Sequence, residues 1–530
     1  MRFLTVEQMR VADRAAVAEA GVPEHVLMDR AGTALAREVA EVAALRGTRS
    51  VVVVGGHGNN GGDAFVAARG LFEDGLKVQV LATCAPAALK GSALEAWDEM
   101  CAHGVPHTVL ATPESWGDDP EVVAGVAMRR GVVVDGVLGT GCRGAPSGAA
   151  ARAIRWINRA RSCAAVVSAD LPSGMDGDTG EAAGEVVRAD VTVTFARPKT
   201  CFLSRAGAER VGHLVVADIG IPDPICDRHT AEAPCELIAQ PEVARSLSLG
   251  GRGWEAHKGA FGHLCVIGGS ADYPHAPVLA ALGALRSGAG LVTLAVPPAS
   301  AAAAAAHAPE AILATLAAPQ GGLSEATLAA WARDLSAYDA VVAGPGLGAS
   351  PHVLGLVAHL VATCGGRLVL DADGLNALAR LRAEGRLPAA AGALVLTPHP
   401  GEAARLLGQT VAEVQGDRLR AVHRLADEYG AVAVLKGSGT LVCAPGGRPW
   451  LCRAGNPGMA SGGTGDVLAG VVGALWAQGL EALEAAQAAV WAHGAAGDFA
   501  ALAEGRRALT ATALAGRLGA AFQRVERQAL

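Results

Sequence analysis

The stretch Ser461-Gly462-Gly463-Thr464-Gly465-Asp466 stands directly before an apolar helical pattern that begins at Val467. Successive small residues leave backbone N–H groups open at the start of a helix, where the helix dipole favours an anion. Asp466 would there be able to take a proton from a hydroxyl group that attacks a phosphoryl group. Alternatively, Asp466 only caps the helix, which is a common role for aspartate. The glycines and Asn456 around it favour phosphate chemistry.

Short apolar runs that end in turns occupy much of the second half of the chain. Such runs are typical of parallel strands that are buried on both faces and alternate with covering helices. Six runs fit this description: 263–267, 291–296, 340–342, 368–370, 394–396 and 432–435. The sequence therefore predicts an α/β domain here, with the alanine tract Ala301–Ala306 as one of its helices.

The first half of the chain shows the same pattern, in which a valine-rich run is followed by a turn. Val51–Val54 leads into Gly55–Gly62, the run 132–134 leads into Asp135–Gly144, and the run 166–167 leads into Asp170–Gly177. This pattern predicts a Rossmann-like doubly wound sheet, in which ligands bind beyond the carboxyl ends of the strands. Both halves are thus expected to be α/β.

The length of the chain, 530 residues, exceeds the roughly 250–300 residues at which a single core usually stops growing. Two domains are therefore expected. The regular alternation lapses between Gly220-Ile221-Pro222-Asp223-Pro224 and Gly250-Gly251-Arg252-Gly253. We place the first domain at residues 1–222, a linker at 223–250 and the second domain at 251–530.

The composition excludes several classes of protein. Hydrophobic residues make up 51% and charged residues 18% of the chain, which is typical of a compact globular protein. The net charge is -7 and no long basic run occurs, so no nucleic acid is expected as a partner. The eleven cysteines show no C-x-x-C pair, which favours neither a zinc cage nor a secreted disulfide framework.

The sequence also gives expectations about location and assembly. An acidic residue, Glu7, precedes any apolar segment, so no secretory signal is expected. The apolar stretch 467–477 is far shorter than the roughly 18 residues that a membrane span needs. We therefore expect a cytoplasmic homo-oligomer that binds small molecules and no membrane.

A second glycine-rich turn, Gly55-Gly56-His57-Gly58-Asn59-Asn60-Gly61-Gly62-Asp63, follows the first strand. It is not the dinucleotide fingerprint, because of its two asparagines and its terminal acid, and it lacks the Gly-Lys-Ser/Thr of a Walker loop. Its amide side chains and free N–H groups could bind a phosphate or a ribose, or coordinate a monovalent cation through oxygen. A tight turn without a ligand is the alternative.

The C-terminal motifs taken together resemble the ribokinase-like superfamily, and more narrowly the ADP/ATP-dependent NAD(P)H-hydrate dehydratases. The motifs that carry the resemblance follow one another in the expected order over residues 240–530: Lys258-Gly259, Gly268-Gly269-Ser270, Gly344-Pro345-Gly346-Leu347-Gly348, Asp371-Ala372-Asp373, Thr397-Pro398-His399-Pro400-Gly401-Glu402, Lys436-Gly437 and Gly463–Asp466. The resemblance implies a ribokinase-like α/β fold for this domain.

The same resemblance implies two sets of contacts. The nucleotide would meet Lys436, Gly437, Ser438, Gly439, Thr440 and Gly465. The hydrated nicotinamide nucleotide would meet Gly346, His399 and Asp466, and Ala284 is expected to line the pocket. His399 lies between two prolines, and such a histidine can instead be purely structural.

The reaction that the resemblance implies removes water from C6 of the hydrated ring and regenerates NADH or NADPH. Hydroxide is a poor leaving group, so phosphate from ADP or ATP would first be transferred to the hydroxyl group, with Asp466 as the base. The ring nitrogen would then expel the phosphate. Mg²⁺ is expected to accompany the nucleotide, because it neutralises charge between phosphates.

Over about residues 1–220 the chain resembles the NAD(P)H-hydrate epimerase domain. The motifs are Pro23…Leu27-Met28-Asp29-Arg30-Ala31-Gly32, the turn 55–63, Asp135-Gly136-Val137-Leu138-Gly139-Thr140-Gly141-Cys142-Arg143-Gly144-Ala145-Pro146, Asp170-Leu171-Pro172-Ser173-Gly174 and Thr194-Phe195…Lys199. Each of the two segments that begin with Asp135 and Asp170 places an aspartate at the carboxyl end of a strand. Asp176 and Asp178 are expected to form turns.

This second resemblance implies a metal site and a substrate site. Potassium would be held by oxygen atoms of Asn60, Asp135 and Ser173, as suits a hard cation. The substrate would be held by Asn59, Asn60, Gly61, Gly62 and Asp63, by the loop residues Gly139, Thr140, Gly141, Cys142, Arg143, Gly144 and Ala145, and by Asp170. Asp170 is expected to be the acid–base group that interconverts the R and S hydrates, with Lys199 assisting by its charge.

The leading hypothesis is therefore a bifunctional repair enzyme whose substrates are hydrated NADH and NADPH together with ADP or ATP. A small-molecule kinase for a vitamin or sugar would use Asp466 in the same way, but it leaves the first half unexplained. A non-catalytic nucleotide-binding or scaffold protein is a further alternative. The joint presence of Asn60, Asp135, Asp170 and Asp466 argues against it.

Overall fold

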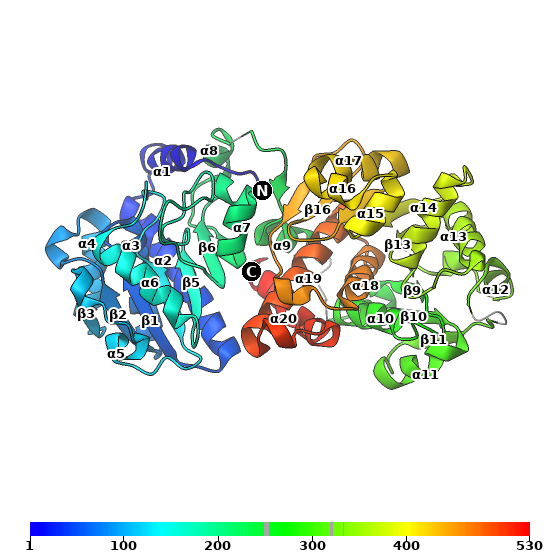
Figure 1. The fold of residues 1–530 in the computed structure, drawn as a ribbon, viewed down its shortest axis with the longest axis horizontal. Helices are drawn as coiled ribbons and strands as arrows, with labels where there is room; N and C mark the ends of the chain where they lie inside the picture. The colour runs from blue at the N-terminus through cyan, green and yellow to red at the C-terminus, as the bar shows by residue number, and fades with distance from the viewer. Residues whose placement is uncertain (231, 249–253, 319–321, 332, 530) are drawn as a thin grey trace. The chain divides into compact units, whose positions relative to one another are not determined.

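The computed structural model divides into two compact units, residues Met1–Ala233 and Pro234–Leu530. It describes residues 1–230, 232–248, 254–318, 322–331 and 333–529. Figure 1 shows that each unit is an α/β domain with helices on both sides of a sheet. The α/β fold class predicted from the sequence is confirmed for both halves.

The N-terminal unit is built on a parallel sheet whose order, among the described residues, is β3-β2-β1-β4-β5-β6-β7. Its strands are β1 (Ser50–Gly55), β2 (Lys77–Ala82), β3 (His107–Val109), β4 (Val132–Gly136), β5 (Ala165–Ala169), β6 (Val191–Phe195) and β7 (His213–Ala217). The order reverses between β1 and β4, and open parallel sheets bind ligands at such a point. The carboxyl ends of β1, β4 and β5 carry the predicted glycine-rich turn and the two aspartate loops.

Helices cover both faces of this sheet (Figure 1). They are α1 (Val6–Ala20), α2 (Glu24–Arg46), α3 (Asn59–Glu73), α4 (Gly91–Ala102), α5 (Pro120–Ala124), α6 (Gly148–Ala160), α7 (Arg205–Val211) and α8 (Asp223–Asp227). On one face, Val52, Val133 and Val166 pack in a common core with Ile154 and Ile157 of α6.

The other face of the same sheet is also buried. Val51 and Val53 of β1 have no exposed surface, although they point away from the α6 side. Helix α3 packs against β1, β2 and β4. Burial of both faces explains why the strands consist of unbroken apolar residues and do not alternate with polar ones.

The C-terminal unit contains a mixed sheet of order β11-β10-β9-β12-β13-β14-β15-β16-β17-β8 in the described part of the chain. Its strands are β8 (Glu236–Leu237), β9 (His263–Ile267), β10 (Leu291–Val296), β11 (Ile312–Thr315), β12 (Ala340–Ala343), β13 (Arg367–Leu370), β14 (Ala393–Leu396), β15 (Val432–Leu435), β16 (Thr440–Cys443) and β17 (Trp450–Cys452). From β11 to β15 the neighbours are parallel, whereas β16 is antiparallel to both β15 and β17.

Two helical layers cover this sheet. Helices α10, α18, α19 and α20 pack together in one layer, and α13, α14, α15 and α17 pack in the other (Figure 1). The bounds are α9 (Gln240–Ser248), α10 (Ala276–Arg286), α11 (Pro298–His307), α12 (Glu325–Ala329), α13 (Pro351–Thr363), α14 (Asp373–Ala383), α15 (Pro400–Leu407), α16 (Val411–Gly416), α17 (Arg418–Tyr429), α18 (Thr464–Ala477), α19 (Ala482–Glu504) and α20 (Ala511–Ala529).

The segment predicted as a linker, 223–250, differs from the expectation. Residues 223–227 form α8 of the first unit, whereas β8 pairs with β17 and α9 packs against α19 and α20 in the second. The division between the units lies between Ala233 and Pro234. The prolines and polar residues of this segment give no sequence pattern from which α8, β8 and α9 could be predicted. The glycine-rich residues 250–253 lie outside the described residues.

Two further features bear on expectations from the sequence. Helix α3 begins at Asn59, so the second half of the glycine-rich turn 55–63 is the first part of the helix. In the described part of the chain, no helix is long and apolar enough to cross a membrane.

Close approach of loops at the carboxyl edge of the second sheet requires glycine. Gly344 follows β12 with a φ of 128°, and a Cβ atom there would lie 1.8 Å from the backbone oxygen of Asp371. Gly385 also has a positive φ, of 65°, but a Cβ atom on it would meet nothing within 4 Å. An alanine at position 385 would therefore introduce backbone strain alone, whereas an alanine at position 344 would introduce strain and a steric collision.

We predict that Gly344→Ala destabilises the protein much more than Gly385→Ala. The second change adds only left-handed strain, about 1–2 kcal/mol. The first must also displace a backbone carbonyl group, for a total of about 3–5 kcal/mol. Urea unfolding of the two variants measures the difference, and equal losses of free energy would contradict the packing described.

Candidate active sites

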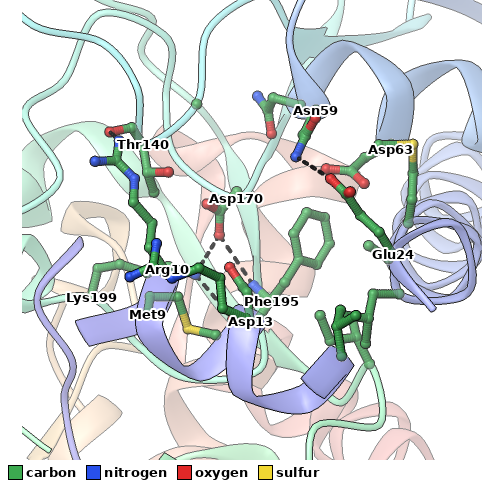
Figure 2. A pocket seen from close by; sticks show the side chains of 18 residues that line it. Met9, Arg10, Asp13, Glu24, Asn59, Asp63, Thr140, Asp170, Phe195 and Lys199 are labelled. Atoms are coloured by element: carbon green, nitrogen blue, oxygen red, sulfur yellow. Dashed lines mark hydrogen bonds and ion pairs between the residues drawn. The ribbon is translucent and has the colours of Figure 1, made fainter. Parts of the chain in front are cut away.

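A cavity of about 450 Å³ opens at the carboxyl edge of the N-terminal sheet. Its walls combine Asn59, Asn60 and Asp63 of α3 with Gly139 and Thr140 after β4, together with residues of α1, α2 and the β6–α7 connection. Figure 2 shows Asp170 and Lys199 at its centre. The three motifs that the sequence placed at strand ends therefore meet in one cavity.

Asp170 is fixed on one side and open on the other. Its Oδ1 atom lies 2.5 Å from Lys199 Nζ and accepts hydrogen bonds from Thr194 Oγ1 at 3.1 Å and from the Phe195 amide at 3.3 Å. Among the described residues, nothing donates to its Oδ2 atom. The backbone of Asp170 has a φ of 57°, which is uncommon for a residue other than glycine. The chain therefore turns away from the strand direction directly after β5. Asp170 can therefore accept or return a proton within the cavity.

Lys199 is almost completely buried, with 1% of its side chain exposed. Besides Asp170 it donates to Thr194 Oγ1 and to the backbone oxygen of Phe195, both at 3.0 Å. A buried ammonium group needs such partners, because an unpaired charge would be strongly destabilising. Lys199 therefore fixes the Asp170 carboxylate in one orientation.

Asp135 and Ser173 form a buried polar group beside the cavity. Asp135 accepts hydrogen bonds from the Ser173 amide at 2.9 Å, from Ser173 Oγ at 2.5 Å and from Ser168 Oγ at 2.8 Å. Burial raises the pKa of Asp135, and these hydrogen bonds oppose that shift. Asn60 donates to the backbone oxygen of Leu138, but its own Oδ1 atom is buried and has no partner among the residues that the structure describes.

The other predicted substrate residues of this unit divide into two groups. Gly61 and Gly62 are buried by packing, since a Cβ atom on Gly61 would lie 2.1 Å from the Gly56 oxygen. Gly141, Cys142, Arg143, Gly144 and Ala145 form an exposed or half-exposed loop beyond the lining of the cavity. Their contacts with substrate stay predictions.

Helix α1 supplies a wall of the cavity that the sequence did not indicate, through Met9, Arg10 and Asp13 (Figure 2). Burial raises the pKa of Asp13 to about 6, with Lys199 opposing and Asp170 adding to the shift. Burial and the same carboxylates raise the pKa of Asp63 well above its ordinary value. Helix α1 carries no glycine turn or strand-end motif, which is why it was missed.

Asp466 lies in the first turn of α18, whose cap position is Gly463. The alternative that Asp466 caps this helix is therefore wrong. Its carboxylate makes no hydrogen bond or ion pair with the described residues. Burial, followed by the nearby carboxylate of Asp371, raises the pKa of Asp466 to about 7, although Lys436 opposes the shift. A base with a pKa near neutrality is suited to proton transfer.

Lys436 lies next to this helix end. Its Nζ atom is 2.7 Å from Asp371 Oδ1, which also accepts from Thr397 Oγ1 at 2.8 Å. A Cβ atom on Gly465 would lie 3.2 Å from the same ammonium group, so a side chain at this position would crowd it. Burial lowers the pKa of Lys436, but the carboxylates of Asp371 and Glu402 outweigh it and the pKa is raised. A lasting positive charge thus stands at the start of α18.

The loop Gly437–Thr440 turns sharply after β15. Gly437 and Gly439 have φ angles of 141° and 68°. Arg418, the first residue of α17, donates from its Nη2 atom to the backbone oxygens of Leu435 and Gly439, each at 3.1 Å. Arg418 was not predicted, because a lone arginine at a helix start has no distinguishing pattern in sequence.

His399 has the structural role that was the alternative to ligand binding. Its Nδ1 atom accepts from the Gly401 amide at 2.9 Å, and Glu402 closes the capping box by accepting from the His399 amide at 2.8 Å. Burial lowers the pKa of His399, so the ring is neutral. Half of its side chain is exposed, and its contact with substrate stays a prediction.

The structure corrects the expectation for Ala284. This residue has no exposed surface within α10, so no ligand reaches it without rearrangement. Ala276, at the start of the same helix, instead approaches Gly346: a Cβ atom on that glycine would lie 3.0 Å from the Ala276 Cβ.

Two residues of α19 support the turn around Asp466 and were also missed. His493 Nε2 lies 2.8 Å from the backbone oxygen of Thr464, and burial lowers the pKa of this histidine to about 4. Asp498 accepts from the Gly455 amide at 2.8 Å and from Asn456 Nδ2 at 2.9 Å. The α19 helix therefore positions the stretch 455–466 from behind.

Comparisons with known proteins agree with this arrangement. Residues 264–518 match the family model described as NAD(P)H-hydrate dehydratase, and residues 24–201 match the YjeF-related protein N-terminus. A solved ADP/ATP-dependent NAD(P)H-hydrate dehydratase from Bacillus subtilis, co-crystallized with ATP/Mg2+, is 30% identical, with a TM-score of 0.48. The match covers 55% of this chain and 99% of that one.

Two curated relatives match along both units. The bifunctional NAD(P)H-hydrate repair enzyme Nnr of Moorella thermoacetica is 38% identical, with 96% of this chain and 94% of that protein covered. The protein of the same name in Escherichia coli is 37% identical over 96% of this chain and 91% of its own length. From the joint match of both halves, in one order and at these identities, it follows that the chain belongs to the bifunctional NAD(P)H-hydrate repair enzyme family.

Proposed function

We propose that the N-terminal unit interconverts the R and S forms of hydrated NADH and NADPH, and that the C-terminal unit dehydrates the S form with ADP or ATP. One observation carries the proposal. Each unit presents a carboxylate near a lysine at the carboxyl edge of its parallel strands: Asp170 beside Lys199, and Asp466 near Lys436. The roles of the individual side chains follow from these two pairs of residues.

In the C-terminal unit, the amide end of α18 and Lys436 would hold the phosphate that is transferred. Asp466 would take the proton from the C6 hydroxyl group while the hydroxyl oxygen attacks that phosphate. The C6–O bond of the phosphate ester would then break with electrons from the ring nitrogen, and loss of the proton at C5 would restore the double bond. Positioning and charge account for most of such a reaction.

Magnesium that arrives with the nucleotide fits the donor set of this site. Asp371, Asp373 and Glu402 each raise the pKa of Asp466, so the carboxylates repel one another. The described residues contain no cluster of three acidic, histidine or cysteine side chains that could hold a metal ion by itself, so the nucleotide phosphates would supply most of the ligands, with Asp371 and Glu402 as the nearby carboxylates. When bound, Mg²⁺ would supply positive charge between the phosphates and these carboxylates.

Potassium also fits, because Asn60 Oδ1 is a buried oxygen without a partner. Asn60, Asp135 and Ser173 would hold the ion, which would supply a fixed positive charge beside the cavity. Asp170 would remain the acid–base group, with its Oδ2 atom directed to the substrate. The cytoplasmic location and the homo-oligomer expected from the sequence stay predictions.

The test of the whole proposal uses an R and S mixture of hydrated NADH, followed at the NADH absorbance with ADP or ATP and Mg²⁺. We expect a fast phase from the S form and a slower phase limited by epimerisation, ending in full conversion. Asp466→Asn should lower both phases at least ~100-fold, because the base is lost. Asp334→Asn, an exposed residue before β12 at the other edge of the sheet, is the control.

Each outcome of this assay has a distinct meaning. Conversion that stops at the S fraction would contradict the epimerase proposal. Conversion without any nucleotide would contradict the phosphorylation step. Phosphorylation of a vitamin or sugar, with hydrated NADH untouched, would favour the alternative of a small-molecule kinase.

The dehydration rate should depend on pH through Asp466. The base must be ionised, and its pKa of about 7 means that protonation removes the active form below that pH. We expect the rate of the fast phase to fall about tenfold per pH unit below pH 7 and to level off above it. A profile that is flat from pH 5 to 8 would show that Asp466 is not the base.

Epimerisation should depend on potassium through Asn60. Asn60→Leu keeps the volume but removes the unpartnered oxygen, so the slow phase should lose its response to K⁺. The fast phase of the same protein serves as an internal control, since it depends on the other unit. A slow phase that still responds to K⁺ in this variant would exclude Asn60 as a ligand.

A further inference from the structure

We propose that Asp13 of α1 is a second catalytic residue of the epimerase, serving the face of the ring that Asp170 does not serve. This inference rests on the epimerase function proposed above. It assigns chemistry to a helix that carries no motif and lies far in sequence from the strand-end loops. The argument starts from what an inversion at C6 requires.

Inversion of a carbon that bears a hydroxyl group needs proton transfer on two faces. The old C6–O bond leaves on one face and the new one forms on the other. The departing hydroxyl group needs a proton, and the incoming water must lose one. A single carboxylate could do both only if the ring turned over within the site. Two groups on different walls avoid that motion.

Asp13 stands on a different wall from Asp170. Asp170 follows β5, whereas Asp13 belongs to α1, which runs along one side of the cavity in Figure 2. The side chain of Asp13 is half-buried and lines the cavity. Within the described residues it makes no hydrogen bond or ion pair, unlike Asp170, whose Oδ1 atom is fixed by Lys199.

The two other acids of the cavity suit this role less well. Glu24 accepts a hydrogen bond from Asn59 Nδ2 at 3.3 Å and faces the outer part of the site. Asp63 is only 8% exposed and has no partner in the described residues, so it would act as a fixed hydrogen-bond donor to substrate. Burial, followed by the charges of Asp170 and Asp13, raises the pKa of Asp63 well above its ordinary value. Asp13, with a pKa of about 6, exchanges protons near neutral pH.

Helix α1 is held firmly against the catalytic loops, which fixes Asp13 in place. Leu4 forms a β-bridge with Lys199, so the segment before α1 lies beside the loop that carries the lysine. Asp178 Oδ1 accepts from the Val6 amide at 2.7 Å. Arg10 donates to the Thr140 backbone oxygen at 3.2 Å. Three separate loops therefore set the position of α1.

The proposed step balances as follows. Protonated Asp13 gives its proton to the C6 hydroxyl group, the C6–O bond breaks, and the electron pair of the ring nitrogen forms a C6=N bond as water leaves. A second water adds to C6 from the other face and gives a proton to Asp170. The C=N electrons return to nitrogen. The reverse inversion uses the two acids in exchanged roles, so no oxidant or other reactant is needed.

The charges around Asp13 set the pH range of this step. The groups that face it are Arg14 of its own helix, Glu24 of α2, Asp63 of α3, Asp170 and Lys199. Asp13 must be protonated to act as the acid, so catalysis should weaken as the pH rises above about 6.

The experiment uses the full chain with K⁺ and purified R-hydrated NADH, without nucleotide, so that only epimerisation occurs. Formation of the S form in H₂¹⁸O is followed by chromatography and mass. We expect Asp13→Asn to lower kcat at least ~100-fold with little change in KM, and to lose the fall in rate above pH 6. Asp13→Glu should recover part of the rate. Glu19→Gln, an exposed acid in the last turn of α1 paired with Arg228, is the matched control.

Four results would overturn the inference. They are an Asp13→Asn rate within threefold of the unmodified protein, a change confined to KM, a loss seen in Asp63→Asn but not in Asp13→Asn, and an S product without one ¹⁸O atom per inversion. If the unmodified protein does not accelerate epimerisation, the proposed function itself fails. That outcome is distinct from a failure of the role of Asp13 alone.

Discussion

Parallel strands must all end at the same edge of their sheet, and the polar loops that build both candidate sites depend on that constraint. In the first unit it brings the turn after β1, the loop after β4 and Asp170 after β5 into one cavity. In the second it brings Asp371 after β13 and Lys436 after β15 within 2.7 Å of each other. The chemistry follows from the topology, because residues far apart in sequence are forced to be neighbours.

A second constraint is electrostatic. Each site holds a lysine with a carboxylate partner, and Lys199 is almost fully buried whereas Lys436 is half-buried. Among the acids with raised pKa values, Asp13 in one unit and Asp466 in the other lie close to these pairs without belonging to them. A buried charge thus supplies a fixed field, while an unpaired acid nearby retains a proton that it can exchange.

The loops at the strand ends could be predicted from the sequence, but the helix residues that surround them could not. Six runs in the second half and three in the first are strands as expected, because strands buried on both faces read as unbroken apolar stretches. The edge strand β3, with three exposed residues, and the antiparallel pair β16 and β17 lack that pattern. Arg418, His493 and Asp13 lie on helices that are distant in sequence from the loops of the two sites. Folding brings them close to those loops, so no local sequence pattern reveals them. The full burial of Ala284 within α10 likewise appears only in the folded structure.

The Asp371–Lys436 pair has a consequence for how such sequences can diverge. Loss of either partner leaves a buried charge uncompensated, at about 3–5 kcal/mol, whereas joint replacement by apolar residues can be nearly neutral for stability. The two positions stand 65 residues apart, yet each restricts which residues the other can become. Neutral drift at one of them is therefore blocked until the other has changed, and the pair should be inherited as a single unit even where the surrounding loops vary freely.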